Sequence, residues 1–139
     1  MATIQEIQAE IVEEFGMFED WMEKYEYIIE LGKNLPLIDD KHKTDNNLIK
    51  GCQSRVWLYA DYKDGKIIYS ADSDAIITKG IVAILIRVLS NQTAEEIAKA
   101  DLAFIDNLGF KEQLSQTRAN GLVSMIKEMK LYALAYQNK

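Results

Sequence analysis

The segment Ile76–Leu89 constrains the fold of this chain more than any other, because apolar side chains occupy nearly every side of it. A helix that is hydrophobic all round must be buried, either in a protein core or in a membrane. Its longest apolar run, from Gly80 to Leu89, is interrupted by Arg87 and is far shorter than the roughly 20 residues that span a bilayer. The sequence therefore predicts a central buried helix and no membrane segment.

Four further helices are predicted on either side of this segment. Two capping boxes mark helix starts, one at Thr3 with Glu6 and one at Thr93 with Glu96. After the first box, apolar residues recur at helical spacing as far as Gly16. The other predicted elements are a helix from Phe18 to Gly32, a charged loop over 39–47, a mixed segment over 101–114 and a last helix from about Thr117.

A β-hairpin is predicted in the middle of the chain. Val56–Tyr62 is rich in β-branched and aromatic residues, Gly65 supplies a turn, and Lys66–Ser73 returns as the second strand. If Leu48–Lys50 pairs alongside, the antiparallel sheet has about three strands. Ser73 and Asp74 offer capping oxygens to the helix that follows. The order of elements predicts an α+β fold in which helices pack against a small antiparallel sheet.

Composition limits both the size and the compartment of this protein. The chain has 139 residues, 48% of them hydrophobic, and is expected to form one domain over 1–139. Its net charge is −6 and it has no cluster of lysines and arginines, whereas nucleic-acid-binding proteins usually carry a basic patch. Residues 1–6 do not resemble a secretory signal, and a single cysteine excludes an internal disulfide. We therefore expect a cytoplasmic protein with no nucleic-acid partner and no membrane contact.

The single cysteine, Cys52, is the best candidate for chemistry. It lies in a polar run between Lys50 and Trp57, whereas an inert free cysteine usually lies among apolar residues. A lone thiol that attacks another sulfur either exchanges with a partner or carries the transferred sulfur as a persulfide. Gly51 would let a partner's backbone approach the thiol closely, although it is about as easily explained as an ordinary turn glycine.

Other kinds of site are poorly supported. One cysteine and one histidine cannot supply a normal zinc or iron–sulfur ligand set, and no glycine-rich phosphate-binding motif occurs. We therefore expect no metal and no cofactor. A peptidase-like pair of Cys52 with His42 is disfavoured, because His42 lies in a charged run that is typical of a solvated surface.

The run Gly51-Cys52-Gln53-Ser54-Arg55-Val56-Trp57 resembles the signature of the SufE/CsdE family of sulfur acceptor proteins. The resemblance covers nearly the whole chain, through the runs Trp21–Tyr25, Ile28–Gly32, Leu35-Pro36, Lys79-Gly80 and Arg118–Leu122. It implies an α+β fold similar to that of the IscU scaffold. Two positions depart from the pattern of many relatives, Gln116 where they have proline and Gln113 where some have histidine.

The resemblance also implies a function. Such a protein stimulates a cysteine desulfurase of the SufS/CsdA type, takes persulfide sulfur onto Cys52 and passes it to an iron–sulfur assembly scaffold. The pyridoxal phosphate of that reaction belongs to the desulfurase. The positions matched near the thiol or at the partner surface are Gly51, Gln53, Ser54, Asp74 and Arg118.

Simpler roles remain open for two of these residues, and other functions remain open for the chain. Arg118 is equally explained as a helix-start or structural ion-pair residue, and Asp74 is more simply explained as a helix N-cap. The main alternative function is a non-catalytic adaptor that activates the desulfurase while Cys52 is dispensable. A stand-alone thiol hydrolase is a third alternative.

Overall fold

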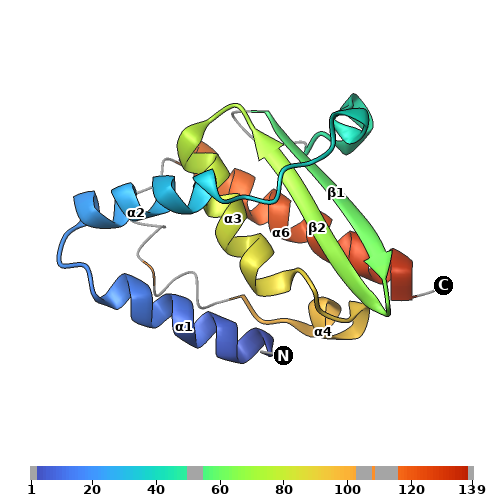
Figure 1. Cartoon of the computed structure of the whole chain (residues 1–139), viewed down its shortest axis with the longest axis horizontal. Coiled ribbons are helices and arrows are strands. Elements are labelled where there is room, and N and C mark those ends of the chain that lie inside the picture. The colour runs from blue at the N-terminus through green and yellow to red at the C-terminus, as the bar shows by residue number, and fades with distance from the viewer. Residues whose placement is uncertain (1–2, 50–54, 103–107, 109–115, 138–139) are drawn as a thin grey trace.

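The computed structural model describes residues 3–49, 55–102, 108 and 116–137, with side chains omitted for 116–121 (Figure 1). The helices are α1 (Ile4–Gly16), α2 (Trp21–Lys33), α3 (Ile76–Leu89), α4 (Ala94–Lys99) and α6 (Gln116–Gln137). The strands are β1 (Val56–Lys63) and β2 (Lys66–Ser73), and two 3-10 turns, η1 (Asp40–His42) and η2 (Asp45–Asn47), lie in the segment predicted as a loop.

Both predicted capping boxes are confirmed. At the start of α1, the backbone N–H of Glu6 donates to the side chain of Thr3, and the side chain of Glu6 accepts from the N–H of Thr3. The same reciprocal pair forms at the start of α4. The start of α2 is capped by Asp20, whose Oδ1 accepts the N–H of Glu23 at 2.9 Å. Local polar contacts of this kind satisfy N–H groups that the helix itself leaves without partners.

The predicted α+β class is confirmed, with fewer full strands than expected. β1 and β2 form an antiparallel hairpin with Val56 opposite Ser73, and the described residues contain these two strands alone. The turn uses positive φ angles at Asp64 (54°) and Gly65 (80°). The expected third strand at 48–50 is reduced to a single bridge between Leu48 and Trp57. The N–H of Ile49 adds a hydrogen bond to the carbonyl of Val56, and Lys50 lies outside the described residues.

The hairpin buries one face against helices. Alternate residues of both strands are buried, as the two-residue repeat of a strand requires: Val56, Leu58, Ala60, Ile67, Tyr69 and Ala71. Figure 1 shows α3 in the middle of the molecule, with α6 running behind the hairpin. The Tyr69 hydroxyl donates to the carbonyl of Met129 in α6 at 2.6 Å, and burial raises the pKa of that hydroxyl. The hydroxyl therefore remains a hydrogen-bond donor and ties the sheet to α6.

The prediction of a central helix is confirmed in α3, which has nine buried residues. It contacts α1, α2, α6 and β2. None of the helices in the described part of the chain has the length and apolar character needed to cross a membrane.

Two glycines bring α2 and α3 into backbone contact. A Cβ atom built on Gly80 would lie 2.1 Å from the carbonyl oxygen of Ile28, and one built on Gly32 would lie 2.9 Å from the backbone nitrogen of Gly80. Real Cβ atoms do not approach backbone atoms so closely. The two helices can therefore cross at this distance only because neither glycine carries a side chain.

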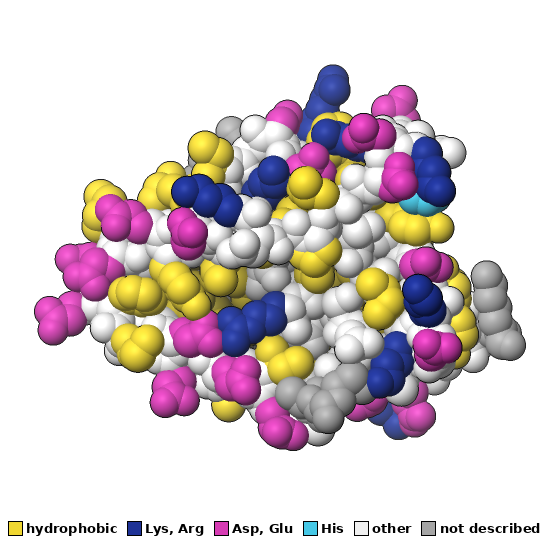
Figure 2. Space-filling model, in the orientation of Figure 1, with side chains coloured by type: hydrophobic (Ala, Val, Ile, Leu, Met, Phe, Trp, Pro, Cys, Tyr) yellow, Lys and Arg dark blue, Asp and Glu magenta, His cyan; other side chains and the backbone are white. Residues whose placement is uncertain are grey.

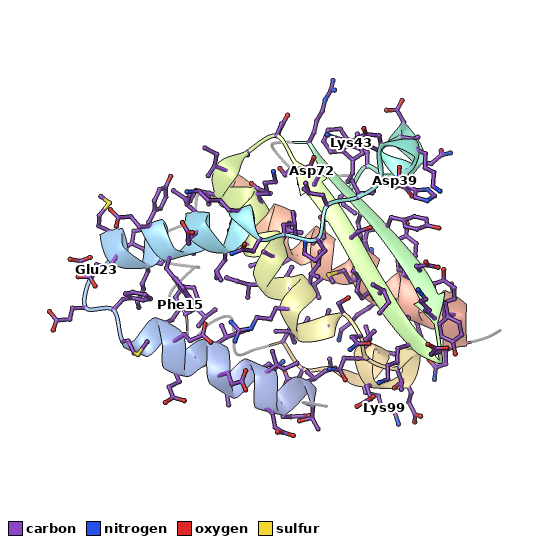
Figure 3. All side chains as sticks on the ribbon, in the orientation of Figure 1. Phe15, Glu23, Asp39, Lys43, Asp72 and Lys99 are labelled. Atoms are coloured by element: carbon purple, nitrogen blue, oxygen red, sulfur yellow. The ribbon has the colours of Figure 1, made fainter. Side chains whose placement is uncertain are left out.

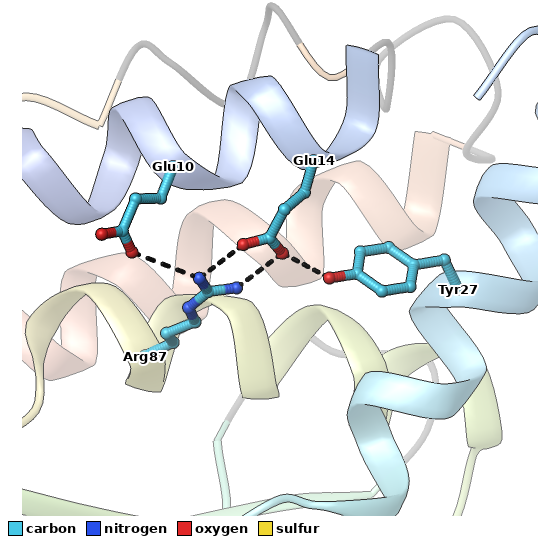
Figure 4. A network of polar contacts seen from close by, with 4 residues as sticks. All are labelled: Glu10, Glu14, Tyr27 and Arg87. Carbon is cyan, nitrogen blue, oxygen red and sulfur yellow. Dashed lines mark hydrogen bonds and ion pairs between the residues drawn. The ribbon is translucent and has the colours of Figure 1, made fainter. Parts of the chain in front are cut away.

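Arg87, which interrupts the apolar run of α3, joins three helices (Figure 4). Its guanidinium donates two hydrogen bonds to the Glu14 carboxylate of α1, at 2.8 and 2.6 Å, and one at 3.4 Å to Glu10. The Tyr27 hydroxyl of α2 donates to the same Glu14 carboxylate. The hydrogen bonds from Arg87 hold the pKa of Glu14 below its ordinary value, against the opposing effect of burial. A bidentate contact of this kind fixes the relative orientation of the helices.

Charge is unevenly distributed over the surface. The first 30 residues hold nine acidic and one basic residue, whereas the rest of the chain holds 13 acidic and 15 basic residues. Acidic side chains accordingly gather where α1 and α2 meet (Figure 2). The net negative charge is therefore a property of the first two helices.

Gly80→Ala should destabilise the protein by about 1–3 kcal/mol, the usual range for overpacking a core, because the new methyl group meets backbone atoms of α2 that cannot rotate away. Urea unfolding measures this change. Gly16→Ala is the matched control, since a Cβ there meets nothing within 4 Å and alanine favours the helix. Equal stability of the Gly80→Ala variant and the parent would contradict the close crossing.

Stability should fall when Glu14 takes up a proton. Its folded pKa lies below the ordinary value of 4.5, so the ion pair stabilises the folded state above pH 4.5 and loses that effect as the pH drops through the folded pKa. Urea unfolding of the parent and of Arg87→Met, measured at a series of pH values from above 4.5 down through the folded pKa of Glu14, tests this effect. The variant should lose less stability on acidification, and identical pH profiles would show that Glu14 and Arg87 are not coupled.

Candidate functional site

The segment that carries the thiol joins two residues that are both held in place. At one end, the N–H of Ile49 donates to the carbonyl of Val56 at 2.8 Å. At the other end, the N–H of Arg55 donates to Oδ1 of Asp74 at 3.1 Å, and the N–H of Asp74 donates to the carbonyl of Arg55 at 3.3 Å. The predicted site residues Gly51, Cys52, Gln53 and Ser54 lie between these ends and outside the described residues.

The role predicted for Asp74 as a helix N-cap is wrong. The cap position of α3 is Ala75, and no side chain caps that helix. The Asp74 carboxylate instead accepts the N–H of Arg55, because the antiparallel pairing of β1 with β2 continues past the strand ends and brings these two residues together. Ser73 does contribute an oxygen locally, accepting the N–H of Ala75 at 3.2 Å.

A cluster of charged residues lies beside this contact, on the outer face of the hairpin. The Asp72 carboxylate binds the ammonium group of Lys43 at 2.9 Å, and the two residues lie close together in Figure 3. It also binds the ammonium group of Lys79 at 3.3 Å. Lys43 also lies over the ring of Trp57, 4.6 Å from its centroid. Burial raises the pKa of Asp72, but hydrogen bonds from Lys43, the Ser73 N–H and Lys79 together lower it below its ordinary value. The carboxylate is therefore ionised at neutral pH and links the 39–47 segment, β2 and α3.

His42 stacks on Tyr59 of β1, with ring centroids 3.7 Å apart and an interplanar angle of 7°. Its backbone carbonyl accepts a hydrogen bond from the side chain of Asn47. One face of the imidazole ring is thus used to pack against the sheet. The disfavoured pairing of His42 with Cys52 involves a residue outside the described ones and stays a prediction.

The sheet is widened at the end that carries the thiol segment. Leu37 forms a parallel bridge to Ala71 on the free side of β2, and Leu48 forms an antiparallel bridge to Trp57 on the free side of β1. The N–H of Ile38 and the carbonyl of Pro36 both bond to Ala71, each at 3.0 Å. Four described chain segments therefore lie side by side at this end of the sheet.

Sequence reasoning missed the Asp72 cluster and the bridge at Leu37. A signal for Asp72 existed, because it lies at an outward-facing position of a predicted strand that is otherwise mostly uncharged. Arg118 is the third residue of α6, but its side chain is outside the described set. Its role near the thiol or at a partner surface therefore stays a prediction.

The described residues define an α+β protein. Its single cysteine lies in a short connection between Ile49 and Arg55, which are both held by hydrogen bonds. Comparison with known proteins identifies its family. The chain belongs to the SufE family, because the family model, described as an Fe-S metabolism associated domain, matches residues 9–133.

Individual relatives agree with this assignment. An uncharacterized SufE-like protein from Rhizobium meliloti is 40% identical over 126 residues, covering 87% of this chain and 90% of the relative. One from Synechocystis is 38% identical over 136 residues, covering 98% and 86%. The sulfur acceptor protein CsdE of Escherichia coli is 39% identical over 110 residues, covering 78% and 75%.

A solved structure shares the fold. The solution structure of a hypothetical protein from Thermus thermophilus superposes with a TM-score of 0.80, covering 96% of this chain and 97% of that one, at 16% identity. The arrangement of helices around the hairpin is therefore found in a solved protein whose sequence has diverged far from this one.

Asp74→Ala should increase the rate at which iodoacetamide modifies Cys52, because it removes the oxygen that holds the N–H of Arg55, three residues beyond the thiol. The loss of one such hydrogen bond costs about 1 kcal/mol, so the midpoint of thermal unfolding should fall only slightly. Asp74→Asn keeps an acceptor oxygen and serves as the control. Equal modification rates in the parent and Asp74→Ala would show that this contact does not limit access to the thiol.

Proposed function

We propose that this protein is a sulfur acceptor and carrier, taking sulfane sulfur from a cysteine desulfurase of the SufS/CsdA type onto Cys52. The observation that carries the proposal is the position of the single cysteine, in a five-residue segment whose flanking residues Ile49 and Arg55 are held by the hairpin. Membership of the SufE family and 39% identity to a sulfur acceptor protein support it.

The proposed transfer needs no cofactor on this chain. The Cys52 thiolate attacks the terminal sulfur of the persulfide on the desulfurase, a new S–S bond forms at Cys52, and the donor's own S–S bond breaks. The donor cysteine leaves as a thiolate, and Cys52 becomes the persulfide. One S–S bond is exchanged for another, so no external oxidant or reductant is required.

The residues around the site support this chemistry indirectly. Two lysines bind the Asp72 carboxylate, so the Asp72 cluster carries no excess negative charge that would repel an incoming anionic persulfide. Asp74 uses one carboxylate oxygen to hold Arg55. We propose that the same end of the hairpin, together with Gly51, Gln53, Ser54 and Arg118, meets the desulfurase.

The onward steps are proposed from family membership. A carrier in iron–sulfur metabolism passes its sulfur to an assembly scaffold, and this transfer would repeat the exchange with a scaffold thiol as the attacking group. We place this exchange in the cytoplasm, a reducing compartment in which a lone thiol stays free.

Mixing the protein with a SufS-type desulfurase and cysteine should add the mass of one sulfur atom to Cys52, detected by intact-protein mass spectrometry and reversed by a reductant. Cys52→Ser should abolish the addition. Because the substitution is nearly isosteric, it should change stability by no more than about 0.5 kcal/mol. The measurements are therefore the mass of each variant and its thermal midpoint.

The adaptor alternative gives a different result in the same experiment. If Cys52→Ser stimulates desulfurase turnover as strongly as the parent, and the parent never acquires reducible sulfur, the protein activates the enzyme without accepting sulfur. A large drop in the thermal midpoint of Cys52→Ser would instead show that Cys52 packs in the core. Thiol-ester or disulfide hydrolysis by the protein alone would indicate the stand-alone hydrolase.

A further inference from the structure

The outer edge of β1 is covered by side chains of α6 instead of by a third strand. In an antiparallel pair, every second residue directs its N–H and C=O groups away from the opposite strand. Leu58 and Ala60 are such residues in β1, since their partners Ala71 and Tyr69 bond outward to other segments, and Val56 bonds outward to Ile49. Exposed groups of this kind attract the edge of another chain.

Each of these carbonyls has a partner. The carbonyl of Val56 accepts the N–H of Ile49 at 2.8 Å, next to the single bridge at Leu48. Beyond that bridge, the Tyr132 hydroxyl lies 3.3 Å from the carbonyl of Leu58, and the Tyr136 hydroxyl lies 3.1 Å from the carbonyl of Ala60. The tyrosines are four residues apart, so one face of α6 reaches successive outward carbonyls of the strand.

The opposite edge of the hairpin is covered mainly by backbone. Ala71 bonds to Pro36 and Ile38, and Ile67 bonds to Asn91 and Gln92. Between them, the N–H of Tyr69 donates to the Ser90 side chain at 2.9 Å. The two edges are therefore protected differently: in the part of the chain that the structure describes, two side-chain hydroxyls bind the carbonyls of β1 beyond Trp57.

The β1 sequence makes this protection necessary. Val56–Ala60 reads Val-Trp-Leu-Tyr-Ala, five residues without a charge, glycine or proline. Segments of high β propensity and low charge pair readily with copies of themselves when an edge is open. The Tyr132 hydroxyl also contacts Oδ1 of Asn47 at 3.2 Å, so this one proton is shared between two acceptors.

We propose that the hydroxyls of Tyr132 and Tyr136 occupy the outer edge of β1. They thereby prevent a second copy of this chain from pairing its own β1 strand with that edge. The partner excluded is a second copy of this chain, because the uncharged run Val56–Ala60 pairs readily with copies of itself and would do so through the carbonyls that the tyrosines occupy. The phenol rings pack on the core whether or not the hydroxyls are present. Replacing tyrosine by phenylalanine therefore removes the hydroxyl from the strand edge and keeps the ring that packs on the core.

The test is the double variant Tyr132→Phe/Tyr136→Phe, which keeps both rings and removes both hydroxyls. Size-exclusion chromatography with light scattering should show a dimer or larger species that increases with concentration, beyond that of the parent. Tyr62→Phe is the matched control. Tyr62 stacks on Tyr136, with ring centroids 5.1 Å apart. Its hydroxyl is not one of the groups that bind the carbonyls of Leu58 and Ala60. This control should behave as the parent does.

A lysine placed on β1 distinguishes association through β1 pairing from association through another surface. Adding Tyr62→Lys to the double variant places like charges along the new pair of strands and should reverse the association. A folded double variant with the parent's mass distribution would overturn the proposal, and so would association that the added lysine does not reduce. If the double variant fails to fold, Tyr132→Phe and Tyr136→Phe are tested singly by the same two criteria.

Discussion

The contact between Gly32 and Gly80 is the constraint on which the rest of the structure depends. It allows α2 and α3 to cross with their backbones touching, so that α3 lies close to α2 while its other sides contact β2 and α6. The residue before Gly80 is Lys79, which binds Asp72, and the start of α3 follows Asp74 by two residues. The helix crossing thus positions the frame of the candidate site, because Lys79 lies at the crossing and also binds Asp72.

The described part of the candidate site consists of contacts that hold the two residues flanking the thiol segment. Backbone bonds fix Ile49, the Asp74 carboxylate fixes Arg55, and Asp72 joins neighbouring segments through two lysines. A carrier must present its sulfur to one protein and then to another. In the proposed carrier role, sulfur would be handed on while the contacts at Ile49 and Arg55 stay in place.

The sequence predicted the parts of the fold that depend on local patterns. Both capping boxes, the buried α3 and the hairpin with its turn at Gly65 are confirmed, since each rests on residues close in the chain. The N-cap role of Asp74 was wrong, because the contact of Asp74 with Arg55 depends on the pairing of two strands and not on neighbouring residues. The role of Cys52 stays a prediction, and spacing along a sequence does not reveal that Lys43 and Lys79 share one carboxylate.

The Arg87 network also bears on the order in which the chain folds. β1, β2 and α3 form one continuous stretch, whereas the bond from Arg87 to Glu14 joins residues 73 apart and that from Tyr69 to Met129 joins residues 60 apart. Closing long loops costs conformational entropy before any contact forms, and such topologies fold slowly. We expect the hairpin and α3 to assemble first, with α1 and α6 docking afterwards from opposite ends of the chain.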